Sequence, residues 1–281
     1  SKLVNKIHLP HWILFLLVVV FILRIPSFFE PYSYGDEMIY LTLGQGMRQG
    51  LTFYKDIHDN KPPLLYVVAG IAGSLFWLKA ILAFWNLATI VLFWKLSQVL
   101  FPKKEKLHKV ATWTYAILTT IPLLEGNIAN AEIFMIGPII AAFLILFAKK
   151  GEPKNLVASG VVFSIATLFK VPGSFDMLAI VAFWLITIGI KKDNLRQTAR
   201  FTSYLLVGFF IPIGASLVWF SLKGALNEYI TAAFLQNITY LSSWRPKDLG
   251  QAFLTKNAPL LTRAAVVIIG LNRLRNICRK N

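Results

Sequence analysis

Long apolar runs in this chain are separated by short polar connections. A helix needs about 20 mainly apolar residues to cross the hydrocarbon core of a bilayer. The pattern therefore predicts an all-α integral membrane protein, with residues 1–281 forming a single polytopic membrane domain. We expect about eight transmembrane helices, over residues 12–29, 80–100, 110–124, 133–148, 156–172, 174–190, 201–222 and 258–271.

Basic clusters predict how these helices are oriented. The clusters read "PKKEKLHK", "KKGEPK", "KKDNLRQTAR" and "RLRNICRK". Lys and Arg are enriched in cytoplasmic loops, so we expect these clusters and both termini on the cytoplasmic side of a cell membrane. A full crossing by the apolar segment 61–77 would move the later clusters outside. We therefore expect a juxtamembrane or re-entrant helix there, in a first outer loop over residues 30–79. The Pro62–Pro63 pair would begin it, since proline is tolerated in a first helical turn.

Composition narrows the class of protein. Hydrophobic residues make up 56% of the chain and charged residues 15%, whereas soluble domains carry roughly a quarter charged residues. The net charge of +16 comes from dispersed clusters, so we expect membrane lipids as partners and no nucleic acid. The single cysteine, Cys278, excludes a disulfide within the chain and a CxxC site. Ten of the 13 acidic residues fall outside under the predicted topology.

The two ends of the chain allow fewer statements. The first span lacks an A-x-A-like cleavage site, so we expect no cleavable signal peptide. The ending "RLRNICRKN" is compatible with a short terminus or with a truncation.

Two adjacent carboxylates, Asp36 and Glu37, follow the first span in "GDEMIYLTLGQGMRQG". This stretch predicts an amphipathic helix that ends at Gly50. Its apolar side chains could face lipid: Met38, Ile39, Leu41 and Leu43. An acid at a helix start is favoured by the helix dipole, so Asp36 is either a residue that stabilises the helix start or a functional carboxylate.

Four further ionisable residues lie near the outer ends of the expected spans: Asp59, Lys61, Glu132 and Lys170. Ionisable groups at membrane depth are costly and are functional candidates by default. Each also has a structural alternative. Asp59 and Lys61 could belong to a solvated turn, and Glu132 could be an acid at a helix N-terminus. Lys170 could extend its ammonium to the membrane surface, where it would also be a good partner for a lipid-linked phosphate.

A carboxylate and a cation on the same membrane face suit transfer of a group from a lipid phosphate to an acceptor hydroxyl. The carboxylate would accept the hydroxyl proton and the cation would stabilise the departing phosphate. The main alternative is a transporter or flippase of a lipid-linked or small anionic substrate. Such proteins need polar or broken helices near the bilayer midplane, whereas the mid-span positions here are mostly apolar. A non-catalytic membrane scaffold, the third alternative, would not require Asp36.

Five motifs occur in order over residues 24–173: "RIP", "GDEMIY", "GLTFYKDIHDNKPPLLY", "NAEIF" and "LFKVPG". With them the chain resembles the polyprenyl-phosphate-dependent glycosyltransferases of the C superfamily, especially the bacterial relatives of protein O-mannosyltransferases and aminoarabinose transferases. The resemblance implies many transmembrane helices, with juxtamembrane helices of the first outer loop over the active site. It also implies inverting transfer of a sugar from a polyprenyl-phosphate donor to a lipid, glycan or protein acceptor.

The resemblance implies roles for individual residues. Asp36 would be the general base, and Glu37 would contact the acceptor or orient the base. For substrate binding we expect Asp59, Lys61, Glu132 and Lys170, with Lys61 lining the donor site and Lys170 at the lipid phosphate. The chain is shorter than many members of the superfamily. Its last outer loop, "LQNITYLSSWRPK", adds Tyr240 and Arg245 as sugar or phosphate contacts. We predict no dedicated metal site, although acids beside a phosphate could hold a divalent cation.

Overall fold

The structure is a computed structural model that describes residues 9–148, 151–188, 192–236 and 265. The chain divides into two compact units, Ser1–Asn237 and Ile238–Asn281, and everything below concerns the first. The described residues are predominantly helical, without a β-strand, and Phe53 and Ile57 form an isolated bridge. The predicted all-α class is thus confirmed for this part of the chain. The single domain over residues 1–281 stays a prediction.

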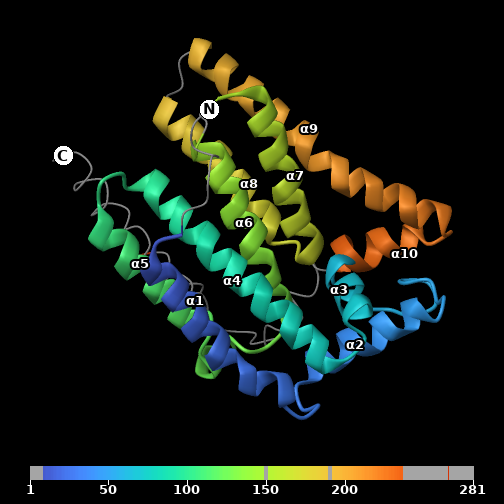
Figure 1. Cartoon of the computed structure of the whole chain (residues 1–281). Coiled ribbons are helices and arrows are strands. Elements are labelled where there is room, and N and C mark those ends of the chain that lie inside the picture. The colour runs from blue at the N-terminus through green and yellow to red at the C-terminus, as the bar shows by residue number, and fades with distance from the viewer. Residues whose placement is uncertain (1–8, 149–150, 189–191, 237–264, 266–281) are drawn as a thin grey trace, which may run out of the picture. The chain divides into compact units, whose positions relative to one another are not determined.

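Seven helices correspond to the first seven expected spans, and the eighth, over 258–271, lies outside the described residues (Figure 1). The seven are α1 His11–Arg24, α4 Leu75–Leu100, α5 Glu105–Leu118, α6 Ala131–Ala148, α7 Pro153–Phe169, α8 Gly173–Ile188 and α9 Lys192–Leu222. The remaining elements are η1 Ile25–Phe29, α2 Gly35–Arg48, α3 Leu64–Ala72, η2 Pro122–Leu124, α10 Leu226–Ile230 and the π-helical turn η3 Thr231–Leu235.

Four helical segments are long and apolar enough to cross a membrane: His11–Phe29, Leu75–Leu100, Ala131–Ala148 and Asp193–Leu222. Helices α7 and α8 are apolar but shorter, with 17 and 16 residues. The expected span over 110–124 is not one continuous helix. Helix α5 ends at Leu118, and after Thr119 and Thr120 the chain continues as a separate turn at Pro122, where proline has no N–H to extend the helical ladder.

The long helices pack in two groups that meet where α4 contacts α6 (Figure 1). Helix α4 contacts α1 and α5, while α7 contacts α6, α8 and α9. Two glycines bring α7 and α9 close together. A β-carbon on Gly160 would lie 2.0 Å from the backbone oxygen of Leu205, and one on Gly208 would lie 1.9 Å from that of Val157. Small residues that let helix backbones approach are typical of helix contacts within membranes.

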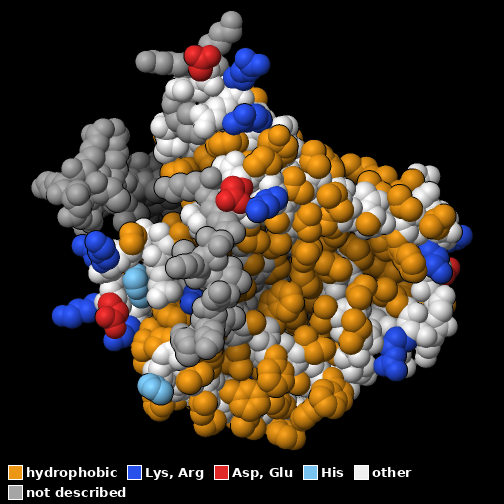
Figure 2. All heavy atoms as spheres, turned by 45° about the horizontal axis from the view of Figure 1, so that its top comes forward, with side chains coloured by type: hydrophobic (Ala, Val, Ile, Leu, Met, Phe, Trp, Pro, Cys, Tyr) orange, Lys and Arg blue, Asp and Glu red, His pale blue; other side chains and the backbone are white. Residues whose placement is uncertain are grey.

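Large apolar side chains remain exposed on the outside of the helices. Examples with more than 60% exposure are Phe15, Phe29, Ile71, Ile186 and Leu222. Figure 2 shows a broad hydrophobic surface on one face, with charged side chains mainly around its margins. An apolar surface of this extent is unfavourable in water, and it agrees with helices that contact lipid.

The predicted outer loop over residues 30–79 contains two short helices that cross each other. Helix α2 ends two residues before Gly50, which has a φ of +93°, in agreement with the prediction. Helix α3 begins directly after Pro62–Pro63 and ends at Gly73, with a φ of +68°. Its nine residues span only about 14 Å at a rise of 1.5 Å per residue, so the segment 61–77 does not cross a bilayer as one helix.

The crossing of α2 and α3 depends on two glycines. A β-carbon on Gly44 would lie 2.5 Å from the backbone nitrogen of Gly70, so no larger residue fits without a shift. The same crossing corrects one expectation. Leu41 and Leu43 pack partly against the protein core rather than facing lipid, while Ile39 is exposed. Glu37, Tyr40 and Gly44 lie on the buried face of α2.

Candidate functional site

Side chains from distant parts of the chain bring several helix ends together. Arg24, at the end of α1, donates through Nη2 to the backbone oxygens of Thr119 (2.6 Å) and Gly126 (2.9 Å), between α5 and α6. Glu132, at the start of α6, forms an ion pair with Lys170, at the end of α7. We call this part the acidic end, defined by the helix ends and connections over residues 24–40, 49–79, 119–132 and 169–173.

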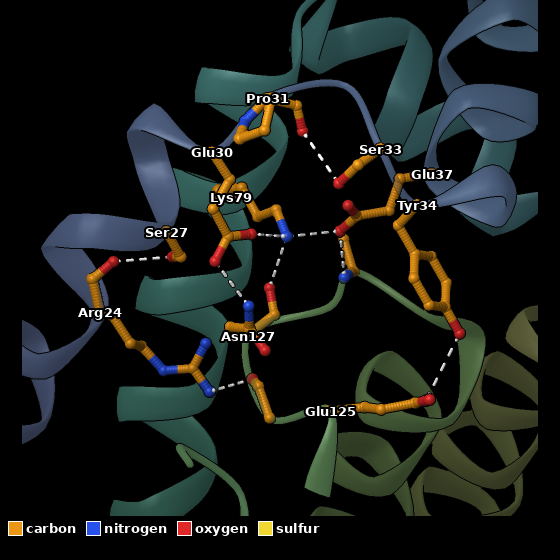
Figure 3. A network of polar contacts seen from close by, with 12 residues as sticks. Arg24, Ser27, Glu30, Pro31, Ser33, Tyr34, Glu37, Lys79, Glu125 and Asn127 are labelled. Atoms are coloured by element: carbon orange, nitrogen blue, oxygen red, sulfur yellow. Dashed lines mark hydrogen bonds and ion pairs between the residues drawn. The ribbon is translucent and has the colours of Figure 1, made fainter. Parts of the chain in front are cut away.

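A buried lysine lies at the centre of the acidic end (Figure 3). The Lys79 side chain is fully buried in the first turns of α4. Its Nζ lies 2.8 Å from Oε1 of Glu37 and 3.0 Å from Oε2 of Glu30, and it donates to the backbone oxygen of Asn127 at 2.7 Å. A buried charge is tolerated only when it is paired and hydrogen-bonded. Lys79 therefore joins α4, α2 and the loop before α6.

The same oxygen of Glu37 that contacts Lys79 has a second partner. Its Oε1 also accepts a hydrogen bond from the backbone N–H of Ala129 at 2.6 Å, and the residue is only 2% exposed. A side chain so buried has almost no surface to offer an acceptor. Of the two roles expected for Glu37, this geometry favours orientation of the base, Asp36, over direct contact with the acceptor.

The loop before α6 is fixed by further contacts of the same network. The Asn127 amide donates to Oε1 of Glu30 at 2.6 Å. The Tyr34 hydroxyl donates to Glu125 at 3.4 Å. These contacts bind the linker between α1 and α2 to the loop between α5 and α6, as Figure 3 shows.

Asp36, next to Glu37, has the opposite exposure. Its side chain is 46% exposed, and the Tyr40 hydroxyl donates to its Oδ2 at 2.8 Å. Lys61 places its Nζ 3.4 Å from the same oxygen and 4.9 Å from the centre of the Tyr40 ring. The two residues predicted from separate motifs are thus neighbours. Among the described residues, no side chain or backbone group bonds the second oxygen, Oδ1.

Asp59 lies in the loop between α2 and α3 and is also held by a tyrosine. The Tyr66 hydroxyl donates to its Oδ2 at 2.6 Å, and the Asn60 backbone N–H donates to Oδ1 at 2.7 Å. The rings of Tyr66 and Tyr40 meet edge to face, with their centres 5.7 Å apart. The two tyrosines therefore connect the carboxylates of Asp59 and Asp36.

The Tyr40 hydroxyl also experiences the charge of Glu132, in addition to that of this pair of acids. Burial raises the pKa of the Tyr40 hydroxyl well above that of an ordinary tyrosine, and the hydrogen bond to Asp36 raises it further. The negative charges of Asp36, Asp59 and Glu132 all contribute in the same direction. Three carboxylates from three separate segments of the sequence thus act on one hydroxyl.

The Glu132–Lys170 ion pair is partly open to solvent, because the two side chains are 50% and 30% exposed. Glu132 lies in the first turn of α6, where the helix dipole also favours an acid. Its predicted structural role and its pairing with a cation therefore coexist. Lys170 follows the last residue of α7 in an extended conformation, with a φ of −156°.

Sequence reasoning missed several residues of this site, among them Lys79, Tyr40 and Tyr66. Lys79 had a usable signal, since it lies inside the apolar run "LFWLKAILAF" and apart from every basic cluster. The two tyrosines had none, because aromatic residues on an amphipathic helix are usually core. Tyr240 and Arg245 lie outside the described residues. Within the described part, no three His, Cys, Asp or Glu side chains are grouped closely enough to hold a metal ion.

Comparison with protein-family models, with curated proteins and with solved structures finds no match to this chain. The residues of the acidic end therefore carry the functional proposal.

Proposed function

We propose that this chain is an inverting glycosyltransferase, which moves a sugar from a polyprenyl-phosphate donor to an acceptor hydroxyl at the extracytoplasmic face of the cell membrane. The observation that carries the proposal is the state of Asp36. One oxygen of this half-exposed carboxylate is held by Tyr40 and Lys61, while the other has no partner among the described residues. A general base needs this combination of fixed orientation and an accessible oxygen.

In the proposed reaction Oδ1 of Asp36 takes the proton from the acceptor hydroxyl. The hydroxyl oxygen then forms a bond to the anomeric carbon of the sugar from the side opposite the phosphate. The bond between that carbon and the phosphate oxygen breaks, and its electron pair leaves with the polyprenyl phosphate. Proton transfer of this kind contributes typically 10²–10⁴-fold to the rate.

Lys170 is the proposed partner of the donor phosphate. Without donor it is paired with Glu132, at the solvent-accessible edge of the site. A phosphate would replace this carboxylate as the anion next to the ammonium, which binds phosphate as a point charge. A cation held near the leaving group stabilises the charge that develops there. A divalent cation could add to that stabilisation, and chelation by EDTA would reveal a requirement for one.

Glu37 and Lys79 are proposed as positioning residues. Their ion pair, at 2.8 Å, and the bond from Ala129 to Glu37, at 2.6 Å, join the first turn of α2 to the loop that leads into α6. Asp36 belongs to that turn and Glu132 to the start of α6. The buried contacts therefore set the separation between the base and the second acid of the site.

The polar groups in the middle of α4 support surface chemistry over transport. Asn86 donates to the Thr120 hydroxyl at 3.4 Å, and the Thr89 hydroxyl donates to the backbone oxygen of Trp85 at 2.8 Å. Both are buried and bonded within the protein. A transport path would need such groups to face an aqueous cavity.

The proposal is tested with purified full-length chain, labelled mannosyl- and aminoarabinosyl-phosphopolyprenol as donors, and membrane extract as acceptor. The Asp36→Asn variant should bind donor but lose transfer by a factor of at least about 100. Asp56→Asn is the matched control, since Asp56 is exposed and its carboxylate accepts from the Thr52 backbone N–H of its own turn, at 2.7 Å. Equal transfer by Asp36→Asn and the parent would refute the assignment of the base.

The proposed orientation has a separate test. In a Cys278→Ser background, a single cysteine at Ser33 should react in intact cells with a maleimide that does not cross membranes, because this exposed residue lies at the acidic end. A cysteine at Lys106, at the start of α5, should react only after the cells are opened. The reverse pattern would refute an extracytoplasmic site.

A further inference from the structure

A second group of cations lies where the loop after α2 meets the end of α9. A cavity of about 140 Å³ opens there, lined by Met47, Leu51 and Phe53 on one side and by Trp219 and Lys223 on the other. This cavity shares no residue with the Asp36 cluster or with the Glu132–Lys170 pair. The proposed sugar transfer therefore leaves it unexplained.

One lysine, Lys223, lines this cavity, and a second, Lys55, lies beside the turn that follows it. Lys223 places its Nζ 5.4 Å from the centre of the Trp219 ring. Lys55 approaches from the loop after α2, because a β-carbon added to Gly224 would come within 3.7 Å of its Nζ. Gly224 follows Lys223 directly and has a φ of +62°. The turn at Gly224 therefore brings two lysines, far apart in the sequence, to one place.

Neither lysine is neutralised in the part of the chain that the structure describes. No described carboxylate forms an ion pair with Lys55 or Lys223. Asp56, next to Lys55 in the sequence, accepts a hydrogen bond from the Thr52 N–H of its turn and forms no ion pair with Lys55. Two lysines without an ion-pair partner near one turn create a local positive field, which an anionic ligand would complement.

The surroundings of the two lysines are apolar and exposed. Trp219 is 59% exposed, Leu222 81% and Leu51 43%. Tryptophan next to lysine is typical of the interface between membrane and water. A second cavity, of about 230 Å³, lies between α2 and α3 and shares Met47 with the first. Its lining is mainly apolar and includes Ile71, which is 75% exposed, together with Arg48 and Tyr66.

We infer that this surface binds an anionic phospholipid. Its phosphate would lie between Lys55 and Lys223, and one acyl chain would run past Met47 into the apolar cavity between α2 and α3. The positive charge of the site favours an anion, and the mainly apolar lining of the adjoining cavity favours a hydrocarbon chain. A phospholipid combines both, and free phosphate supplies only the first.

The test uses the full chain in detergent, with lipids of identical acyl chains, and native mass spectrometry to count bound lipid. Phosphatidylglycerol should bind in preference to phosphatidylcholine. A basic residue near an anionic surface contributes roughly a factor of five in affinity, so the Lys55→Gln/Lys223→Gln variant should bind phosphatidylglycerol about 25-fold more weakly. Lys55→Arg/Lys223→Arg should retain the binding, because it keeps both charges.

The matched control is Lys104→Gln/Lys106→Gln, which removes two exposed, unpaired lysines at the start of α5. It should bind phosphatidylglycerol like the parent. Ile71→Gln should weaken binding without any change of charge. The inference would be overturned by equal losses in the two glutamine pairs or by equal binding of both lipids. It would also be overturned if equimolar inorganic phosphate displaced the lipid, which would indicate a simple anion site.

Discussion

Lys79 offers the sharpest test of how the acidic end is held together. The substitution Lys79→Met keeps most of the side-chain volume and removes the ammonium. Glu37 would then stay 2% exposed with the Ala129 N–H as its remaining contact. Removing one partner of a buried ion pair costs about 3–5 kcal/mol. Because Glu30 is 33% exposed and can regain water, we expect a loss near 3 kcal/mol in the free energy of unfolding.

A second substitution separates charge from shape. Glu37→Gln removes the negative charge, while its amide oxygen can still accept the hydrogen bond from Ala129. Added to Lys79→Met, it removes the buried unpaired charge. We therefore expect the double variant to be more stable than Lys79→Met alone, by about 2 kcal/mol. A gain of stability on adding a second core substitution is unusual and would be specific to this pair.

The free energies are measured by denaturant titration in micelles, followed by circular dichroism at 222 nm. Lys109→Met serves as control, since Lys109 forms an exposed ion pair with Glu105 at 2.8 Å, and such pairs contribute about 0–1 kcal/mol. If Lys79→Met cost no more than this control, Lys79 would not support the fold. If the losses of the two single variants simply added in the double variant, the assigned pairing would be wrong.

Three other predictions concern single positions. Gly44→Ala should lower the free energy of unfolding by about 1–3 kcal/mol in the same titration, because its β-carbon would meet the Gly70 nitrogen at 2.5 Å. Gly214→Ala is the control and should be neutral or stabilising, since nothing lies within 4 Å of its β-carbon. Equal effects of the two substitutions would contradict the tight crossing of α2 and α3. Lys170→Ala should change the stability by no more than about 1 kcal/mol but strongly weaken binding of polyprenyl phosphate; a large loss of stability with unchanged binding would make its role structural. The pKa of Tyr40 is raised in the folded protein, so its stabilising contribution is complete below the ordinary value of about 10 and is lost only as the pH rises through the higher folded pKa. The difference in ultraviolet absorbance between the parent and Tyr40→Phe should therefore show no tyrosinate from this residue near pH 10, and its appearance there would contradict the buried hydrogen bond.

The helical architecture was readable from the sequence for a physical reason. In apolar surroundings a backbone must satisfy its own hydrogen bonds, so each long apolar run forms a helix. Local signals also marked the short elements, since α2 ends just before Gly50 and α3 begins after Pro62–Pro63. Length was less predictable. The run expected over 110–124 stops at Leu118, because its last residues form a separate turn.

The acidic candidates were likewise readable from the sequence, because an ionisable residue next to an apolar run is costly wherever it occurs. Which partner each one takes was not readable. Glu37 bonds Ala129, 92 residues away, and Arg24 bonds Gly126, 102 residues away. The partner of a buried charge depends on which helix ends meet, and hydrophobic periodicity carries no information on that.

Asp36 and Glu37 show most clearly which properties follow from the sequence and which from the tertiary structure. The sequence by itself determined that two carboxylates begin an amphipathic helix beside a membrane span. Only the tertiary structure decided that Asp36 is half exposed between Tyr40 and Lys61, whereas Glu37 is buried against Lys79. Neighbouring residues on a helix point about 100° apart, so the contacts of α2 with Lys79 and with the loop before α6 bury one carboxylate and leave the other open.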